Sequence, residues 1–305
     1  MKNALPEVSG LKTDFMVHFE GSYCSVLRHE LRLRNLAFAK RRNLAHAVSY
    51  GEQPVVIYEA LPHLRRHGNF INASYAAILK CPAWNRRLEK FHSQARRSLP
   101  QNDRGWRELD SSMSSDALLM NIFCHPRVAT PNLASLLGVD YPMSLEFGFR
   151  ARVPLKNKRT DRTEVDLKIG SLLLESKLTE GDFQIQKPAI VEVYRDLEAQ
   201  FACQQLPRTS RSEYISYQLI RNVLAAHESH SSFCVLLDER RPDLKDAWYE
   251  VLQCVVDTDL KTRCKLLTWQ ELAAVLPSDL QRFLDLKYGI VPPGRIASRP
   301  WEENP

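Results

Sequence analysis

The sequence predicts an α/β fold in which a helical N-terminal region precedes a core with the element order α-β-β-β-α-β. Two observations predict this class. The spacing of apolar residues changes from a helical period to a period of two near residue 145, and strands then alternate with amphipathic helices. The chain has 305 residues, of which 44% are hydrophobic and 26% charged. This composition is that of a folded protein with one large domain or two smaller ones, and it excludes a disordered chain.

Residues 1–110 are predicted to form a basic, helical region. Apolar residues recur at three- and four-residue spacing from Gly21 to about Gly51, and a second helical stretch runs from about Asn69 to Arg97, interrupted at Pro82. Residues 1–100 hold 16 Lys and Arg against 7 Asp and Glu, a balance of +9. Arginine pairs and aromatic residues are interleaved there: Arg41–Arg42, Arg65–Arg66, Arg86–Arg87 and Arg96–Arg97, with Phe70, Tyr75, Trp84 and Phe91. Such a surface fits a nucleic-acid phosphate backbone; the alternative is a solvated helical face with buried aromatics.

Residues 111–290 are predicted to form the core. Ser114 and Ser115 cap a helix from Asp116 to Phe123, and the apolar alternation of Leu145–Val153 indicates a half-buried strand. Gly170-Ser171 is a two-residue turn signal between strands Glu164–Lys168 and Leu172–Leu178. Further along, the pattern predicts helices over 188–202, 212–228 and 269–276, and strands over 233–238 and 265–268. The tail, residues 291–305, has four prolines and is expected to be extended.

The hairpin around Gly170-Ser171 carries an unusual set of charges. With these two residues in the turn, Asp166 lies opposite Glu175 and Glu164 lies opposite Lys177. Directly opposed carboxylates repel each other, and a divalent cation that both coordinate offsets this repulsion. The alternative is an exposed hairpin face in which Lys177 forms an ion pair with Glu164.

These charges suit the hydrolysis of a phosphodiester bond. Asp166 and Glu175 offer hard oxygen ligands to Mg²⁺, which activates a bound water and neutralises charge on the phosphate. Lys177 would orient that water and add positive charge beside the phosphate. The sequence contains no P-loop, no dinucleotide-binding glycine motif and no G-x-S-x-G. The seven cysteines include no C-x-x-C pair, which argues against a disulfide framework and a zinc finger.

The segment from Asp166 to Lys177 resembles the PD-(D/E)xK nuclease superfamily, in which an acidic residue on the second strand precedes E-x-K on the third. Three segments carry a closer resemblance to bacterial restriction-endonuclease-like proteins: Ser114–Phe123, Glu175–Glu180 and Tyr217–Asn222. The resemblance implies a restriction-endonuclease-like core. It implies Asp166, Glu175 and Lys177 as catalytic residues, with Asp166, Glu175 and the Ser176 carbonyl on the metal. The sequence departs from the pattern at Val165, where the family name implies proline, and at Asp116, where glutamine is expected.

A further catalytic residue is expected on the helix that follows E-x-K. Many superfamily members place a glutamine from this helix near the active site, and Gln218 matches it. The helical period puts Gln218 on a polar face with Arg211, Tyr214 and Arg221; the alternative is that this face is only solvated. Glu146, on the charged face of the first strand, is a weaker candidate.

Together these observations predict a Mg²⁺-dependent DNA endonuclease for which Mn²⁺ can substitute. One alternative is a non-cleaving DNA-binding subunit of a defence, repair or transposition system; another is an interaction protein whose charged hairpin is only a surface. No apolar stretch approaches the length of a membrane span, and no secretory signal is visible, so a cytoplasmic protein is expected. Cleavage of both DNA strands would favour a homodimer.

Overall fold

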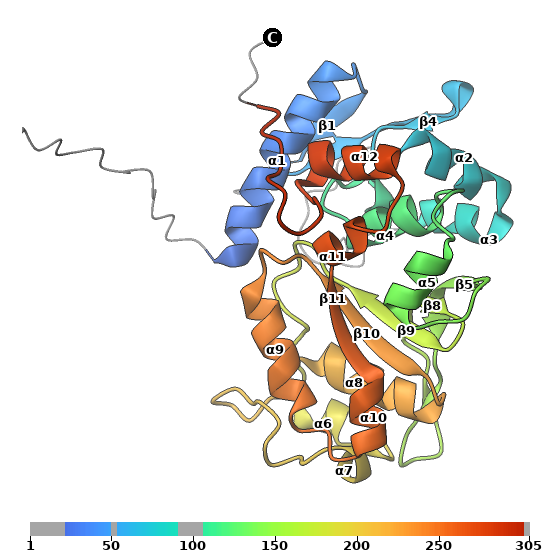
Figure 1. The fold of residues 1–305 in the computed structure, drawn as a ribbon. Helices are drawn as coiled ribbons and strands as arrows, with labels where there is room; N and C mark the ends of the chain where they lie inside the picture. Colours follow the sequence, from blue (N-terminus) through green and yellow to red (C-terminus); the bar gives the residue numbers. More distant parts are fainter. Residues whose placement is uncertain (1–21, 50–53, 91–105, 302–305) are drawn as a thin grey trace, which may run out of the picture.

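The computed structural model describes residues 22–49, 54–90 and 106–301 (Figure 1). Its centre is a mixed five-stranded sheet in the order β11-β10-β9-β8-β5. The strands are β5 (Leu145–Arg150), β8 (Glu164–Ile169), β9 (Leu172–Ser176), β10 (Ser232–Leu237) and β11 (Cys264–Thr268). Pairing is antiparallel from β5 through β8 to β9, and parallel from β9 through β10 to β11. The predicted α/β class is confirmed.

The elements that surround the sheet follow the predicted order. Helix α4 (Ser115–Phe123) precedes β5, β8 and β9, and helix α8 (Tyr217–Glu228) lies between β9 and β10 in the chain. The Ser114 side chain accepts a hydrogen bond from the backbone N–H of Ala117, so it is the predicted helix cap. Residues of β9 are buried on both faces of the sheet, since Leu174 packs with α4 side chains and Leu173 with α8 side chains.

The N-terminal region is less helical than predicted. Helix α1 (Tyr23–Arg41) ends well before Gly51, because Asn43 has a left-handed φ of 47° and the chain then enters a short hairpin. The second stretch is divided at Pro82, and its residues beyond 90 lie outside the described part of the chain. The elements are β1 (His46–Val48), β2 (Val56–Tyr58), β3 (Ala60–Leu61), η1 (Pro62–Leu64), β4 (Arg66–His67), α2 (Asn72–Lys80), α3 (Pro82–Asn85), η2 (Arg86–Glu89) and η4 (Glu108–Asp110).

Two of the predicted core helices are also shorter than expected. Residues 188–202 form only two single turns, and the helix predicted from 212 begins at Tyr217 because Ser216 has a left-handed φ of 60°. The other elements are α5 (Pro131–Leu137), β6 (Val153–Pro154), β7 (Thr160–Asp161), α6 (Pro188–Val191), α7 (Leu197–Gln200), α9 (Pro242–Leu252), α10 (Thr258–Arg263), α11 (Trp269–Ala273) and α12 (Ser278–Tyr288). Residues 291–301, the described part of the tail, contain no helix or strand.

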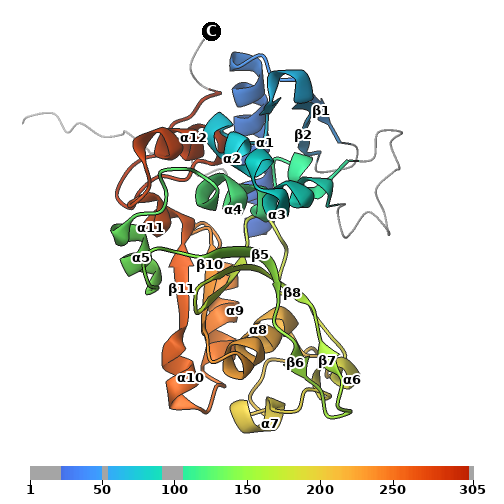
Figure 2. The same cartoon turned by 90° about the vertical axis from the view of Figure 1, so that its right-hand side faces the viewer.

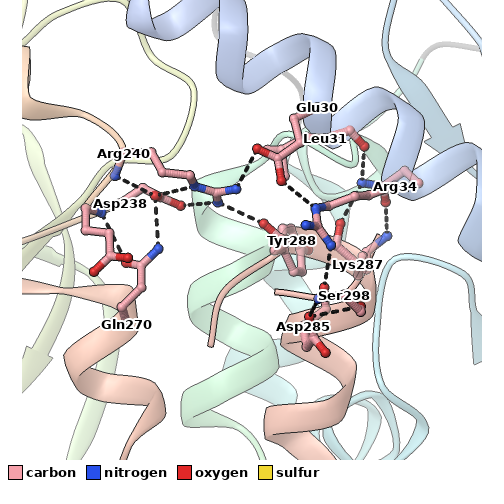
Figure 3. A network of polar contacts seen from close by, with 12 residues as sticks. Glu30, Leu31, Arg34, Asp238, Arg240, Gln270, Asp285, Lys287, Tyr288 and Ser298 are labelled. Carbon is pink, nitrogen blue, oxygen red and sulfur yellow. Dashed lines mark hydrogen bonds and ion pairs between the residues drawn. The ribbon is translucent and has the colours of Figure 1, made fainter. Parts of the chain in front are cut away.

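Helix α1 packs against α12, beyond one end of the sheet in both views (Figures 1 and 2). A chain of polar contacts fixes this arrangement (Figure 3). Arg240 forms ion pairs with the buried Asp238, at the end of β10, and with Glu30 of α1. The buried Lys287 of α12 donates a hydrogen bond to the Asn35 side chain of α1 at 2.5 Å. Side chains of α1, α12 and the sheet belong to one apolar cluster. The predicted domain boundaries near residues 110 and 290 stay predictions.

Within residues 22–49, 54–90 and 106–301, no helix combines the length and the apolar composition that a membrane crossing requires.

Candidate active site

The hairpin of β8 and β9 has the predicted register. Leu167 pairs with Leu174 and Ile169 with Leu172, so Gly170-Ser171 forms the turn. The regular pairing stops before Asp166. There, Ser176 donates two hydrogen bonds to Oδ2 of Asp166, from its backbone N–H at 2.7 Å and from its hydroxyl at 2.9 Å. The Asp166 carboxylate is therefore fixed against the end of β9.

The alternative of an exposed hairpin face, with Lys177 paired to Glu164, is wrong. Glu175 is 2% exposed and Lys177 is 5% exposed, because β9 is an inner strand that helices cover on both faces. Lys177 Nζ lies 2.9 Å from Oε1 of Glu175 rather than pairing with Glu164. Burial lowers the pKa of Lys177, but Glu175, Glu180 and Asp166 together raise it above its usual value. Lys177 is consequently charged.

The Asp166 carboxylate is much less well compensated. Burial raises its pKa well above the usual range, and the nearby carboxylates of Glu175 and Asp116 raise it further. Lys177 and the Ser176 N–H lower it by less. Within the described part of the chain, all hydrogen bonds to Asp166 reach Oδ2, which leaves Oδ1 available. A cation beside Oδ1 would relieve the repulsion between the carboxylates.

The carboxylate oxygens of Asp166 and Glu175 fit a hard divalent cation, although the site offers few ligands. The described residues contain no group of three or more His, Cys, Asp and Glu side chains arranged to hold a metal. Mg²⁺ commonly binds proteins through only one or two carboxylates and keeps several waters, so Asp166 and Glu175 suffice chemically. Ser176, whose carbonyl is the third expected ligand, is the last residue of β9.

Asn222, a residue that the sequence analysis did not select, completes the contacts of Glu175. Its side-chain Nδ2 donates to Oε2 of Glu175 at 2.8 Å, while Lys177 occupies Oε1. Arg221 donates to Oδ1 of Asn222 and so fixes the orientation of the amide. Asn222 lies four residues after Gln218 on α8, so the two side chains share one helix face. That four-residue spacing from Gln218 is the sequence signal that could have identified Asn222.

Gln218 lies in the first turn of α8 but forms no hydrogen bond with the Asp166 or Glu175 carboxylate. Its backbone N–H donates to the carbonyl of Phe183, whose ring lies 5.6 Å from Lys177 Nζ. Its Oε1 is buried and has no hydrogen-bond partner within the described residues. The predicted polar helix face is wrong in part, because Arg211 and Tyr214 precede α8 and Tyr214 is buried.

Two cations of the N-terminal region reach the site. Arg87 and Lys90 donate to Oδ2 of Asp116 at 3.0 Å and 2.8 Å, and Arg87 also lies 3.7 Å from Glu164. Burial would raise the pKa of Asp116, but Lys90 and Arg87 lower it below its usual value. Asp116 is therefore an ionised neighbour of Asp166, a role that its sequence position left open.

The described aromatic residues of the N-terminal region pack into the protein, as in the alternative of a solvated face with buried aromatics. Phe70 and Tyr75 stack on each other and are buried, and the Trp84 ring packs edge-on against Phe147. The side chain of Arg87 is only 12% exposed, whereas Arg86 is exposed. Arg96–Arg97 and Phe91 lie outside the described residues. Phe70, Tyr75 and Trp84 are therefore core residues rather than a base-stacking surface.

The remaining candidates lie apart from the carboxylate pair. Glu146 is exposed on β5, opposite Lys168 of β8. Glu164 accepts a hydrogen bond from the Arg150 guanidinium at 3.3 Å.

The protein is thus an α/β protein in which a mixed five-stranded sheet carries a buried Glu-Ser-Lys segment beside an aspartate. Residues 33–289 match the family model described as restriction endonuclease associating with ARP, and the chain belongs to that family. The match spans both the N-terminal region and the sheet. No curated protein and no solved structure matches the chain.

Proposed function

We propose that this protein is a Mg²⁺-dependent DNA endonuclease of the PD-(D/E)xK type, with the core of a restriction endonuclease. The observation that carries the proposal is the pair of neighbouring carboxylates, Asp166 and Glu175, next to the buried Lys177. The element order α4, β5, β8, β9, α8, β10 and the family match support the same interpretation. Two carboxylates held close together at a buried position cost folding free energy, and a cation-dependent function gives a reason for keeping them.

In this proposal Asp166, Glu175 and the Ser176 carbonyl hold the metal. When bound, Mg²⁺ supplies a water of lowered pKa and neutralises charge on the scissile phosphate, and Mn²⁺ serves as a substitute. Ser176 fixes the Asp166 carboxylate through its N–H and hydroxyl, so Oδ1 is presented in a single orientation. Asn222 does the same for Glu175.

Lys177 has the most direct role in the proposed chemistry. Its ammonium is charged and buried, and it donates to Glu175 at 2.9 Å. From this position it would orient the attacking water and offset negative charge that develops on the phosphate. Gln218 would act through its buried Oε1, which has no hydrogen-bond partner among the described residues and would accept a hydrogen bond from a water.

A second candidate function is that of a non-cleaving DNA-binding subunit. One observation favours it: both oxygens of Glu175 already have partners, Lys177 and Asn222, as in a structural ion pair. The family description names an association with ARP, which suits a subunit of a larger assembly. A homodimer is a further proposal, for cleavage of both strands.

Incubation of the purified chain with supercoiled plasmid separates these functions. The nuclease proposal expects nicked or linear DNA with Mg²⁺ or Mn²⁺ and intact plasmid with EDTA. A subunit that only binds would retard the plasmid in a gel under both conditions and leave it supercoiled.

A further inference from the structure

A groove along β5, the edge strand of the sheet, is lined by three exposed arginines. They are Arg150 and Arg152, at and beyond the end of β5, and Arg162, in the loop before β8. Glu146 is the only acidic residue in the lining, so the groove has an excess of positive charge. Phe149 adds an aromatic side chain between the charges.

The charge in the groove is available to a ligand. Within the described residues, Arg152 and Arg162 form no ion pair, and Arg150 has only the Glu164 contact, with 65% of its side chain exposed. Other arginines near the sheet are engaged: Arg87 pairs with Asp116, and Arg241 pairs with Asp243. Unpaired guanidinium groups in a concave surface attract phosphate oxygens, which they bind through two parallel hydrogen bonds.

The groove also adjoins the candidate active site. Phe147 pairs with Leu167 and Phe149 with Val165, so Gly148 lies opposite Asp166. Gly148 lines the groove and has a left-handed φ of 67°. A Cβ atom added at this position would lie 2.2 Å from Nη1 of Arg87, so any other residue would displace that guanidinium and strain the backbone. Asp166 therefore lies on the strand that pairs directly with β5, and Glu175 lies on the next strand, β9.

We propose that this groove binds the sugar-phosphate backbone of DNA and leads it along β5 to Asp166. The inference rests on the proposed function for its choice of DNA, and it assigns the backbone contact to Arg150, Arg152 and Arg162 rather than to the N-terminal arginine pairs. The positive charge favours a polyanion over pairing with a second protein strand, because charged side chains on an edge strand oppose such pairing.

Binding of a short fluorescent DNA duplex in EDTA tests the groove without requiring cleavage. The variant is Arg152→Gln/Arg162→Gln, and the matched control is Lys245→Gln/Arg282→Gln, which removes the same charge from exposed positions on α9 and α12. Both helices lie away from β5 (Figure 1). We expect the groove variant to raise Kd about tenfold and to flatten the salt dependence by about two units of slope, whereas the control changes both far less.

The outcomes separate this proposal from the nuclease assignment. If the wild type cleaves plasmid but the groove variant binds DNA with unchanged affinity and slope, the groove is rejected and the nuclease remains. If the wild type never cleaves but the groove variant alone loses binding, the groove is supported and the nuclease is rejected. Absence of DNA binding by the wild type overturns the groove. A wild-type dimer that becomes a monomer in the groove variant also overturns it, since the surface is then a protein interface.

Discussion

Asn222 on α8 donates a hydrogen bond to Oε2 of Glu175 on β9, at 2.8 Å. Both residues are almost completely buried, and Lys177 donates to the other oxygen of the same carboxylate. The helix that follows E-x-K thus holds the glutamate in one orientation. Stability and activity should therefore depend on the same contact.

Replacement of Asn222 by alanine should destabilise the protein and slow cleavage. The substitution leaves one oxygen of a buried carboxylate without its donor, which costs about 1–3 kcal/mol in free energy of unfolding. Urea denaturation measures this cost. Asn85→Ala, at an exposed position on α3, is the control and should stay within about 0.5 kcal/mol of the wild type. Equal losses in the two variants would contradict the role of Asn222.

The ion pair between Glu175 and Lys177 should be far more important for stability than a surface pair of the same length. Its side chains are 3% and 7% exposed, whereas Lys156 and Glu198, also 2.9 Å apart, are 47% and 75% exposed. Glu175→Ala leaves a buried lysine unpaired and should cost about 3–5 kcal/mol. Glu198→Ala should cost less than about 1 kcal/mol. Chemical denaturation of the two variants compares them, and a small loss for Glu175→Ala would mean that the site is open to water.

Asp166→Asn should stabilise the metal-free protein at neutral pH. The raised pKa of Asp166 means that the folded state resists ionisation, so wild-type stability falls as the pH rises from about 4 through the raised pKa. The asparagine variant lacks this loss, and its amide oxygen, in the place of Oδ2, still accepts from Ser176. Thermal melts across this pH range measure the difference, which should grow with pH. A variant less stable than the wild type at pH 7 would contradict the repulsion.

Added metal should reverse the order of stability of the wild type and Asp166→Asn. Bound Mg²⁺ or Mn²⁺ stabilises only a protein that binds it, by about 2.7 kcal/mol at a hundred times Kd. The wild type should gain melting temperature when metal is added, and Asp166→Asn should not. Asp246→Asn, at an exposed position on α9, should respond like the wild type. Equal gains for wild type and Asp166→Asn would place the metal elsewhere.

The adjacent arginines Arg86 and Arg87 should behave differently. Arg86 is exposed, and its replacement by alanine should leave stability within about 0.5 kcal/mol. Arg87→Ala removes a hydrogen bond to the buried Asp116 and should cost about 2 kcal/mol, with slower cleavage. Cleavage rates and denaturation of the two single variants test this; identical behaviour would contradict the placement of Arg87 in the site.

Local signals predicted much of the core correctly. The alternation of apolar residues and the Gly170-Ser171 turn predicted strands β5, β8 and β9 and the register of the hairpin, because these depend on neighbouring residues. Burial of the hairpin was not predictable in this way. It depends on β10 and on helix α8, which join β9 only in the folded chain, and charged residues at those positions are typical of solvent-exposed strands.

Long-range contacts explain what the sequence analysis missed at the site. Arg87 and Lys90 belong to a region that the charge balance predicted as a DNA-binding surface, yet they contact Asp116, more than twenty residues later in the chain. Helix α12 was not predicted, although Leu280, Phe283 and Leu284 recur at helical spacing and Gly289 ends the helix. Its polar contact with α1 gave no signal, since Lys287 and Asn35 are polar residues that become buried only together.

The most direct test of the account is the rate of plasmid cleavage by wild type, Asp166→Asn and Asp246→Asn, purified in parallel and assayed with Mg²⁺. We expect the wild type and Asp246→Asn to cleave at equal rates, and EDTA to stop cleavage by both. Asp166→Asn should be at least a hundredfold slower (about 10²) while it still binds DNA. Equal cleavage by wild type and Asp166→Asn would contradict the account, because the activity would then not depend on the carboxylate pair.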